Sequence, residues 1–318
     1  MRLASRCSTL PKMRMILSFF CVAFILFSGC RGSGSEESDD LLTVTASTTQ
    51  AADFAANVVG DRGEVDQILS ANSDPHDYEP RPSDAQGLAA ADLVVSSGGE
   101  VDEWLDQLVE SSDSGAPVVS LIESMPVRAD AGGALDPHWW QNPQNAEIAV
   151  TLIAEELIAV DPEGEEAYRE NAEAYIERLA ELDRAVAGCI ERVPQDERKL
   201  VTSHDALGYY ADRYGIEVIG TVIPARTTQA QASAGEVADL VGVIRSSEVR
   251  AIFPEAGVSG QLEQAVADEA GAVVGGELWA DALGPQGSSG ETYLEAVASN
   301  TQTIVEGLTG GAETCDPG

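Results

Sequence analysis

The stretch Glu163–Ile190, EGEEAYRENAEAYIERLAELDRAVAGCI, decides how the rest of the chain is organised. Its apolar residues recur at steps of three, four or seven positions, and charged residues fill the other faces. These apolar positions are Tyr168, Tyr175, Leu179, Leu182, Val186 and Cys189. Neither Gly nor Pro interrupts residues 165–187, which predicts one amphipathic helix about 40 Å long at roughly 1.5 Å per residue. We expect a rigid linking helix over residues 161–192 that packs within the molecule; a coiled-coil seam of about three heptads is the alternative.

Short apolar runs alternate with amphipathic stretches on both sides of this helix. The runs cover 42–46, 65–69, 93–96 and 118–121 before it, and 200–202, 218–222, 251–253 and 273–274 after it. The amphipathic stretches lie near 50–60, 84–91, 101–111, 205–214, 234–246 and 260–270. This alternation predicts βαβ units on parallel sheets, with one α/β lobe over residues 41–160 and another over residues 193–318.

Three local patterns indicate where helices begin. Ser83-x-x-Gln86 and Ser233-x-x-Glu236 are typical of capping boxes. Asn142-Pro143 is typical of an N-cap residue followed by proline at the first helical position. All three agree with the spacing of the apolar runs.

Composition limits the classes of protein. The chain has 318 residues, of which 44% are hydrophobic and 23% charged, so a globular fold is expected and wholesale disorder is excluded. It carries 18 Lys and Arg against 54 Asp and Glu, a formal net charge of −36. Nucleic acid is an unfavourable partner because its phosphates would be repelled.

The N-terminus has the pattern of an export signal. Four basic residues lie in residues 1–14, and the uncharged apolar run Met15–Phe27 follows. That run is shorter than the about 20 residues of a membrane span but suits a secretory signal. Phe27-Ser-Gly-Cys30 resembles a lipobox, which predicts a signal peptide over 1–29, lipid on Cys30 and a flexible tether over 30–40. An ordinary cleaved signal with an incidental cysteine is the alternative.

Export also affects the remaining cysteines. Cys7 and Cys21 leave with the signal, and Cys30 is the predicted anchor, so Cys189 and Cys315 remain. Two thiols in an oxidising compartment predict one disulfide; two separate buried thiols are the alternative.

The chain has only three histidines, and each lies next to the end of a predicted element. His76 follows the second strand, His138 precedes the helix at Pro143, and His204 ends the first strand of the second lobe. Ligands gather at the carboxyl ends of parallel strands, so these histidines can converge between the lobes, and Asp281 after the last strand can supply a fourth ligand. Imidazole and carboxylate suit Zn²⁺. Three solitary histidines are the alternative.

At this point the sequence resembles the metal-binding lipoproteins of bacterial zinc and manganese ABC importers, the cluster A-I solute-binding proteins. The matching segments are His76-Asp-Tyr-Glu-Pro80, Pro82-Ser-Asp84, Asp136-Pro-His-Trp-Trp140, Asn142-Pro143, Ser203-His-Asp-Ala-Leu-Gly-Tyr-Tyr210, Ile252-Phe-Pro-Glu255 and Asp281-Ala-Leu-Gly284. The resemblance implies two lobes, each with a four-stranded parallel sheet, joined by a rigid helix, with metal held between them.

The resemblance also implies the ligands and the cargo. It assigns His76 and His138 in the first lobe, and His204 and Asp281 in the second. Members with His at the third position are generally zinc proteins, whereas those with Glu are generally manganese proteins. Two features differ from the family pattern: there is no His-rich loop, and Gln231-Ala-Ser233 stands where Glu-Pro-Ser is common. Because the match around Asp281 is short, Glu277 and Glu255 remain alternative carboxylates.

We therefore expect a monomeric, exported capture protein, lipid-anchored to the outer face of the cytoplasmic membrane. It would bind Zn²⁺ and deliver it to an ABC permease; Mn²⁺ or Fe²⁺ is an alternative cargo. A zinc-dependent hydrolase is the alternative of another class. It would require an open metal position beside Glu255 or Glu79 as a base, whereas four protein ligands favour transport.

Overall fold

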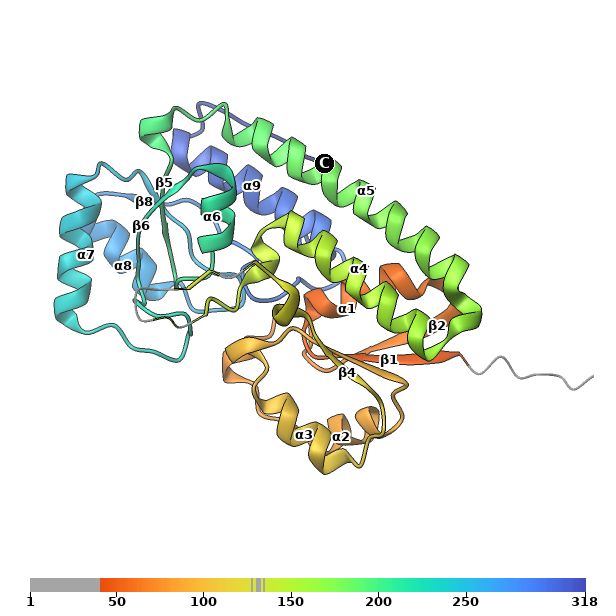
Figure 1. Ribbon diagram of the computed structural model, residues 1–318. Helices are drawn as coiled ribbons and strands as arrows, with labels where there is room; N and C mark the ends of the chain where they lie inside the picture. Colours follow the sequence, from red (N-terminus) through yellow and green to blue (C-terminus); the bar gives the residue numbers. More distant parts are fainter. Residues whose placement is uncertain (1–40, 127, 130–132, 134) are drawn as a thin grey trace, which may run out of the picture. The chain divides into compact units, whose positions relative to one another are not determined.

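Two groups of parallel strands, one near each end of a long helix, form the framework of the protein (Figure 1). The computed structural model describes residues 41–318 except 127, 130–132 and 134. The predicted signal peptide, the lipidation site Cys30 and the tether lie outside the described residues.

The N-terminal half (residues 41–160) contains one four-stranded parallel sheet in the order β2-β1-β3-β4. Its strands are β1 (Leu42–Ala46), β2 (Gly63–Gln67), β3 (Leu93–Ser96) and β4 (Val118–Ser120). Strand β3 is buried on both faces: Leu93 and Val95 enter the main core, and Val94 enters a smaller core under the outer helices. This explains its uninterrupted apolar sequence.

Helices cover both faces of this sheet. They are α1 (Thr49–Val59), α2 (Pro82–Ala89), α3 (Trp104–Ser112) and α4 (Pro143–Val160). Asn142 caps α4 as predicted, with its side chain accepting from the Gln144 N–H at 3.0 Å. The predicted capping box at Ser83 is wrong: α2 already begins at Pro82, and the Asp84 carboxylate accepts from the Arg81 N–H at 2.6 Å.

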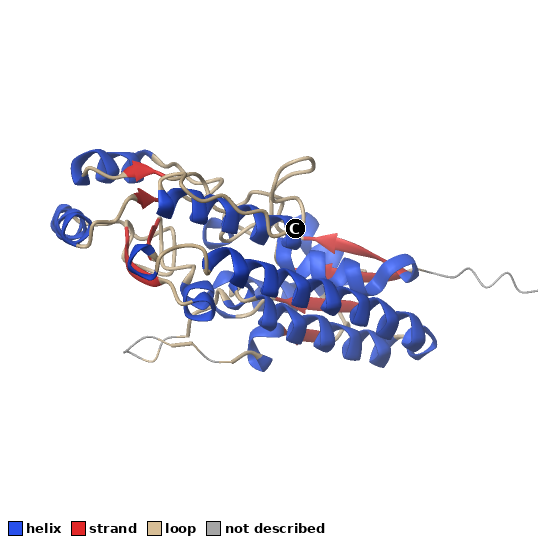
Figure 2. Ribbon diagram, turned by 90° about the horizontal axis from the view of Figure 1, so that it is seen from above, coloured by secondary structure: helices blue, strands red, loops and turns tan. Residues whose placement is uncertain are grey.

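The predicted long helix is present as α5 (Glu165–Ile190), preceded by a short 3-10 turn at Pro162–Gly164. Its apolar stripe is buried, as the spacing predicts. Helix α5 contacts α4 and α1 in the N-terminal half, and α9 and α6 in the C-terminal half. Figure 2 shows long helices lying side by side across the strands.

The C-terminal half (residues 193–318) contains two pairs of parallel strands. The strands are β5 (Lys199–Thr202), β6 (Glu217–Thr221), β7 (Ala251–Ile252) and β8 (Val273–Val274). Strand β5 pairs with β6, and β7 pairs with β8. A single parallel bridge between Thr202 and Phe253 joins the pairs, which gives the order β6-β5-β7-β8. The four predicted strands are therefore present, but the ladder between the two pairs is short.

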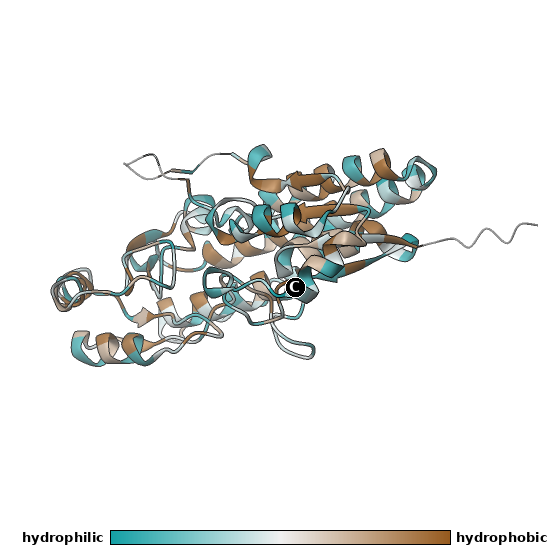
Figure 3. Ribbon diagram, turned by 90° about the horizontal axis from the view of Figure 1, so that it is seen from below, coloured by the Kyte–Doolittle hydropathy of each residue, from teal (hydrophilic) through white to brown (hydrophobic). Residues whose placement is uncertain are grey.

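Four helices complete this half: α6 (Gly208–Tyr214), α7 (Ala234–Ser246), α8 (Gln261–Ala270) and α9 (Tyr293–Thr309). The capping box at Ser233 and Glu236 is confirmed at the start of α7. Helix α9 is a helix that the sequence reading missed, although Thr292 and Glu295 form a capping box at its start. Figure 3 shows that the helices carry both brown and teal residues, in keeping with their amphipathic sequences. Among the described residues, no helix is long and apolar enough to cross a membrane.

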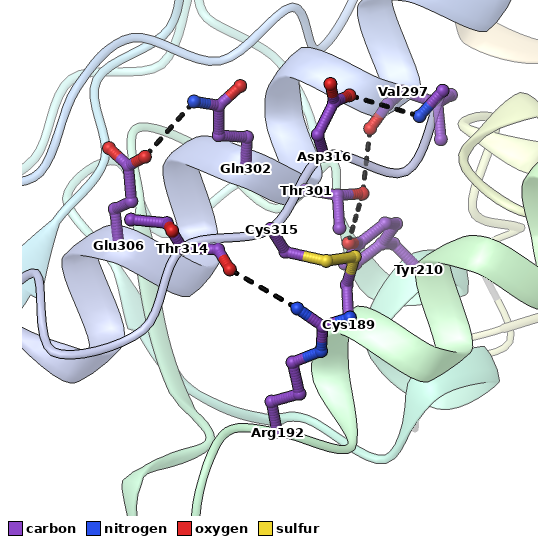
Figure 4. The surroundings of a disulfide bond; sticks show 11 residues. Cys189, Arg192, Tyr210, Val297, Thr301, Gln302, Glu306, Thr314, Cys315 and Asp316 are labelled. Atoms are coloured by element: carbon purple, nitrogen blue, oxygen red, sulfur yellow. Dashed lines mark hydrogen bonds between the residues drawn. A yellow bond between two sulfur atoms is a disulfide. The ribbon is translucent and has the colours of Figure 1, made fainter.

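The predicted disulfide between Cys189 and Cys315 is present (Figure 4). It joins the last turn of α5 to the segment after α9, and both cysteines are buried. Arg192 donates to the backbone oxygen of Thr314 at 3.4 Å beside it. The C-terminal segment is thus fastened to the end of the long helix.

Candidate metal centre

The structure brings together all four residues that the sequence singled out. One ligand atom from each of His76, His138, His204 and Asp281 lies within 4.8 Å of the others. Nε2 of His76 is 3.2 Å from Oδ2 of Asp281, and Nε2 of His204 is 3.1 Å from the same oxygen. Nε2 of His138 is 3.4 Å from Oδ1 of Asp281. All four side chains are at most 2% exposed.

Each half of the chain contributes two of these residues. His76 lies in a 3-10 turn (Pro75–Asp77) after β2, and His138 directly precedes the 3-10 turn Trp139–Gln141 that leads into α4. His204 follows the end of β5. Asp281 follows Leu278, whose backbone pairs with Glu255 beyond β7. The site therefore forms where the carboxyl ends of the strands of both halves meet.

A carboxylate sets the orientation of His138. Nδ1 of this fully buried ring lies 2.8 Å from Oδ1 of Asp136, which also accepts from the His138 backbone N–H at 3.1 Å. Burial by itself would raise the pKa of Asp136, but the hydrogen bonds and charge of His138 and the charge of Arg128 outweigh burial and lower it. A charged Asp136 holds the proton on Nδ1 and leaves the Nε2 lone pair directed at the site.

Glu255 takes a comparable position beside His204, at ion-pair distance but without a well-directed hydrogen bond. Its Oε2 lies 2.9 Å from Nδ1 of His204, on the opposite side of the ring from Asp281. Burial and the charge of Asp281 raise the pKa of Glu255 to about 7. Glu277, the other alternative carboxylate, is exposed. The geometry therefore brings Asp281 into the cluster, rather than Glu255 or Glu277.

The His76 turn is held by both halves. The side chain of Asp74 accepts from the His76 backbone N–H at 2.9 Å. From the C-terminal half, Thr228 donates to the Asp74 carboxylate, and Gln229 donates to the backbone oxygen of His76. The loop after β6 thus reaches over the turn that carries the first histidine.

Asp281 is buried without the partners that a carboxylate needs. Neither of its oxygens accepts a well-directed hydrogen bond from the described residues. The loop itself is fixed: Trp140 and Gln141 both donate to the backbone oxygen of Ala280, at 2.9 and 2.7 Å. Burial would raise the pKa of Asp281, but the imidazoles of His204 and His138 outweigh burial and hold it well below its usual range. A buried anion among three imidazole nitrogens fits a divalent cation.

The two tryptophans that follow His138 have different environments. Trp139 is core and donates to the backbone oxygen of Ser97 at 3.0 Å. The Trp140 ring lies 5.5 Å from the His138 ring, edge to face, so it forms a wall of the site.

In the sequence, Glu255 was considered only as a metal ligand or as a catalytic base. Its contact with His204 arises from the bridge between β5 and β7, which no local sequence pattern indicates.

Comparisons with known proteins agree with this fold and site. The family described as "Zinc-uptake complex component A periplasmic" matches residues 44–307. The manganese-binding lipoprotein MntA of Halalkalibacterium halodurans is 31% identical over 301 residues, 93% of this chain and 99% of that protein. The iron-binding protein YfeA of Yersinia pestis is 31% identical over 304 residues, 94% of this chain and 97% of that protein. The solved periplasmic zinc-binding protein TroA from Treponema pallidum has a TM-score of 0.80 at 27% identity and covers 84% of this chain and 99% of that one.

Fold and site together define a metal-binding solute-binding protein of an ABC importer. The chain belongs to the family of zinc-uptake complex component A, as the sequence resemblance indicated. Members of this family are solute-binding proteins of ABC transporters and not enzymes, so the hydrolase interpretation is set aside. Neither glutamate that a hydrolase could use as a base faces the cluster from within: Glu79 is exposed, and Glu255 contacts His204 from outside the cluster.

Proposed function

We propose that the protein captures Zn²⁺ outside the cytoplasm through His76, His138, His204 and Asp281, and delivers it to the permease of an ABC importer. One observation carries the proposal: three imidazole nitrogens and one carboxylate oxygen face one another within 4.8 Å. Ligands about 2.0–2.1 Å from a tetrahedral zinc ion stand about 3.3 Å from one another. Four separations agree with that spacing: the Asp281 carboxylate lies 3.1–3.4 Å from the three histidines, through Oδ2 for His76 and His204 and through Oδ1 for His138, and Nε2 of His138 lies 3.4 Å from Nε2 of His204.

The choice of zinc rests on His204. An imidazole in this position favours zinc, whereas a carboxylate would move the site towards the harder Mn²⁺. Manganese and iron appear in the names of relatives, so Mn²⁺ and Fe²⁺ are the alternative cargoes.

Metal competition tests this choice. Purified protein would be offered equal amounts of Zn²⁺, Mn²⁺ and Fe²⁺ without oxygen, and the bound metal would be measured by mass spectrometry. We expect zinc in the wild type and a shift towards manganese in His204→Glu. Unchanged zinc preference in that variant would remove the basis for choosing zinc.

We also propose that the protein is a monomer held to the outer face of the cytoplasmic membrane by lipid on Cys30. The relatives named lipoproteins support this location, and confinement near the permease would raise the effective concentration of the loaded protein. In cells, Cys30→Ser should release the protein from the membrane fraction. Retention of that variant in the membrane would contradict the anchor, and a dimer in sedimentation would contradict the monomer.

A further inference from the structure

The chain leading to His138 is fastened to helix α6 of the other half by one arginine. Nη1 of Arg128 lies 2.6 Å from Oδ2 of Asp136, and its Nε lies 3.0 Å from Oδ2 of Asp212. Asp136 is fully buried beside the metal cluster, whereas the Asp212 side chain on α6 is 71% exposed. The planar guanidinium can bridge two carboxylates in this way, which a lysine ammonium on a flexible stem does less well.

Glycine at the start of α6 makes room for this guanidinium. A Cβ atom on Gly208 would lie 2.1 Å from Cζ of Arg128 and 2.2 Å from its Nη1. Gly208 is not among the glycines with positive φ, so space alone, and not backbone conformation, requires glycine here. The next residue adds two contacts: the Tyr209 hydroxyl accepts from the Arg128 backbone N–H and donates to the Pro126 backbone oxygen, both at 3.1 Å.

These contacts connect two metal ligands without passing through the metal. Asp136 binds Arg128 with one oxygen and His138 with the other. Arg128 lies against α6, which begins at Gly208, shortly after His204 in the chain. A displacement of Arg128 would therefore act on His138 through Asp136, and on the start of α6, four residues after His204.

We propose that Arg128 is a positioning residue that holds His138 and His204 in register across the two halves and thereby slows release of the bound metal. This inference deepens the proposed function and rests on it. Arg128 touches neither ligand; it acts on His138 through Asp136, and on the start of α6 through Gly208 and Asp212.

The test compares three variants of the full mature chain. Arg128→Gln removes the bridge, and Gly208→Ala displaces the guanidinium while leaving Arg128 in place. The control is Arg62→Gln. Arg62 has the same kind of environment, with Nε and Nη2 at 3.1 and 2.7 Å from Asp161 and its Nε 2.4 Å from where a Cβ on Gly164 would lie, but it contacts none of the four clustered residues.

Two measurements are made on each protein. Zn²⁺-loaded protein is mixed with excess chelator, and the release rate is followed; Co²⁺-loaded protein reports ligand geometry through its visible absorption bands. We expect Arg128→Gln and Gly208→Ala to release Zn²⁺ roughly tenfold faster, with altered Co²⁺ bands. Loss of an outer partner of a metal ligand, as Asp136 is to His138, costs roughly 10–100-fold in affinity, and Arg128 acts one contact further out. Arg62→Gln should match the wild type in both measurements.

The inference would be overturned if Arg128→Gln and Gly208→Ala both fold and show wild-type release rates and Co²⁺ bands. It would also be overturned if Arg128→Gln and Arg62→Gln lose the same melting temperature while their zinc release is unchanged. If Arg128→Gln fails to fold, Gly208→Ala decides, because alanine favours a helix and leaves every charge in place. A wild type that retains zinc while both variants behave normally refutes only the role of Arg128. A wild type that retains no metal refutes the proposed function as well.

Discussion

Nε2 of His138 and Nε2 of His204 lie 3.4 Å apart, although 66 residues separate them in the chain. The other ring nitrogen of each faces a carboxylate, Asp136 for His138 and Glu255 for His204. When both Nδ1 atoms hold their protons for these carboxylates, both Nε2 lone pairs point at each other. Two lone pairs so placed repel unless a cation lies between them. The outer carboxylates therefore orient the two rings so that a cation can bind between their Nε2 atoms once both carry lone pairs.

Removing the charge of Asp281 should weaken metal binding most directly. Asp281→Asn keeps the shape of the side chain but places an amide among three imidazole nitrogens. We expect Zn²⁺ affinity to fall by at least roughly tenfold in competition with a chromogenic chelator. Glu277→Gln is the matched control, because Glu277 lies in the same segment but is exposed. Loss of affinity in Glu277→Gln, with Asp281→Asn unaffected, would move the fourth ligand to Glu277.

Metal affinity should decrease as pH falls. Burial by itself would lower the pKa of His204, but the charges of Asp281 and Glu255 outweigh burial and raise it well above 6.5 in the metal-free protein. The proton on His204 must leave before zinc binds, so competition should begin above about pH 6.5. Zinc titrations at about pH 7.5 and about pH 5.5 should give weaker binding at the lower pH; equal affinities would contradict ligation by histidine.

The same proton should affect the metal-free protein in the opposite direction. A histidine whose folded pKa is raised stabilises the fold fully below its unfolded value near 6.5, and this contribution is lost as pH rises through the raised value. The gain in melting temperature on adding zinc should therefore shrink as pH falls, because the metal-free state is strengthened while zinc binding weakens. Thermal melts with and without zinc at both pH values measure the gain; a gain that grows at low pH would contradict this prediction.

The disulfide should contribute to stability and not to metal binding. Cys189 and Cys315 are 126 residues apart. Closing a loop of that length lowers the entropy of the unfolded chain, which raises the free energy of unfolding by about 3–5 kcal/mol. The double variant Cys189→Ser and Cys315→Ser should unfold at lower denaturant concentration, while its zinc affinity stays within about twofold of the wild type. Without reducing agent, the double variant should unfold at the same denaturant concentration as wild-type protein whose disulfide has been reduced. A large loss of zinc affinity would mean that the C-terminal segment shapes the site.

Local sequence patterns predicted most elements, because the apolar runs that form strands are short and well separated. Strands β1, β3 and β8 occupy the predicted positions. Strand β2 was predicted over 65–69 but ends at Gln67, since its length is set by pairing with β1; Leu69 is buried beyond the strand. At α2, Pro82 at the first helical position and Asp84 two residues later were stronger start signals than Ser83.

The histidine cluster was predictable because all three histidines lie at element ends that a parallel α/β fold brings to one edge. The carboxylates that face the outer ring nitrogens of these histidines were harder to foresee. Asp136 is only two residues from His138 in the chain, whereas Glu255 reaches His204 only because β7 lies beside β5. Contacts across strands depend on tertiary register, which spacing along the chain does not determine.

Helix α9, which the sequence reading missed, should prove necessary for the site. Asn300 on α9 is buried; its Oδ1 accepts from the Trp279 backbone N–H at 2.8 Å, and its Nδ2 donates to the Trp279 backbone oxygen at 2.7 Å. This pair of bonds fixes the segment two residues before Asp281. Asn300→Ala should lower stability by about 1–3 kcal/mol, because it leaves buried backbone groups unpaired, and should also speed zinc release.

Chemical denaturation and chelator-driven release measure the two effects separately. Gln302→Ala is the control for Asn300→Ala, because the exposed Gln302 side chain lies on the same helix, donates to Glu306 at 3.1 Å, and should leave both quantities unchanged. If Asn300→Ala lowers stability but releases zinc at the wild-type rate, the two hydrogen bonds between Asn300 and the Trp279 backbone support the fold without positioning Asp281. If release accelerates as well, the carboxylate depends on a helix from the end of the chain, and the metal site includes α9 as an outer support.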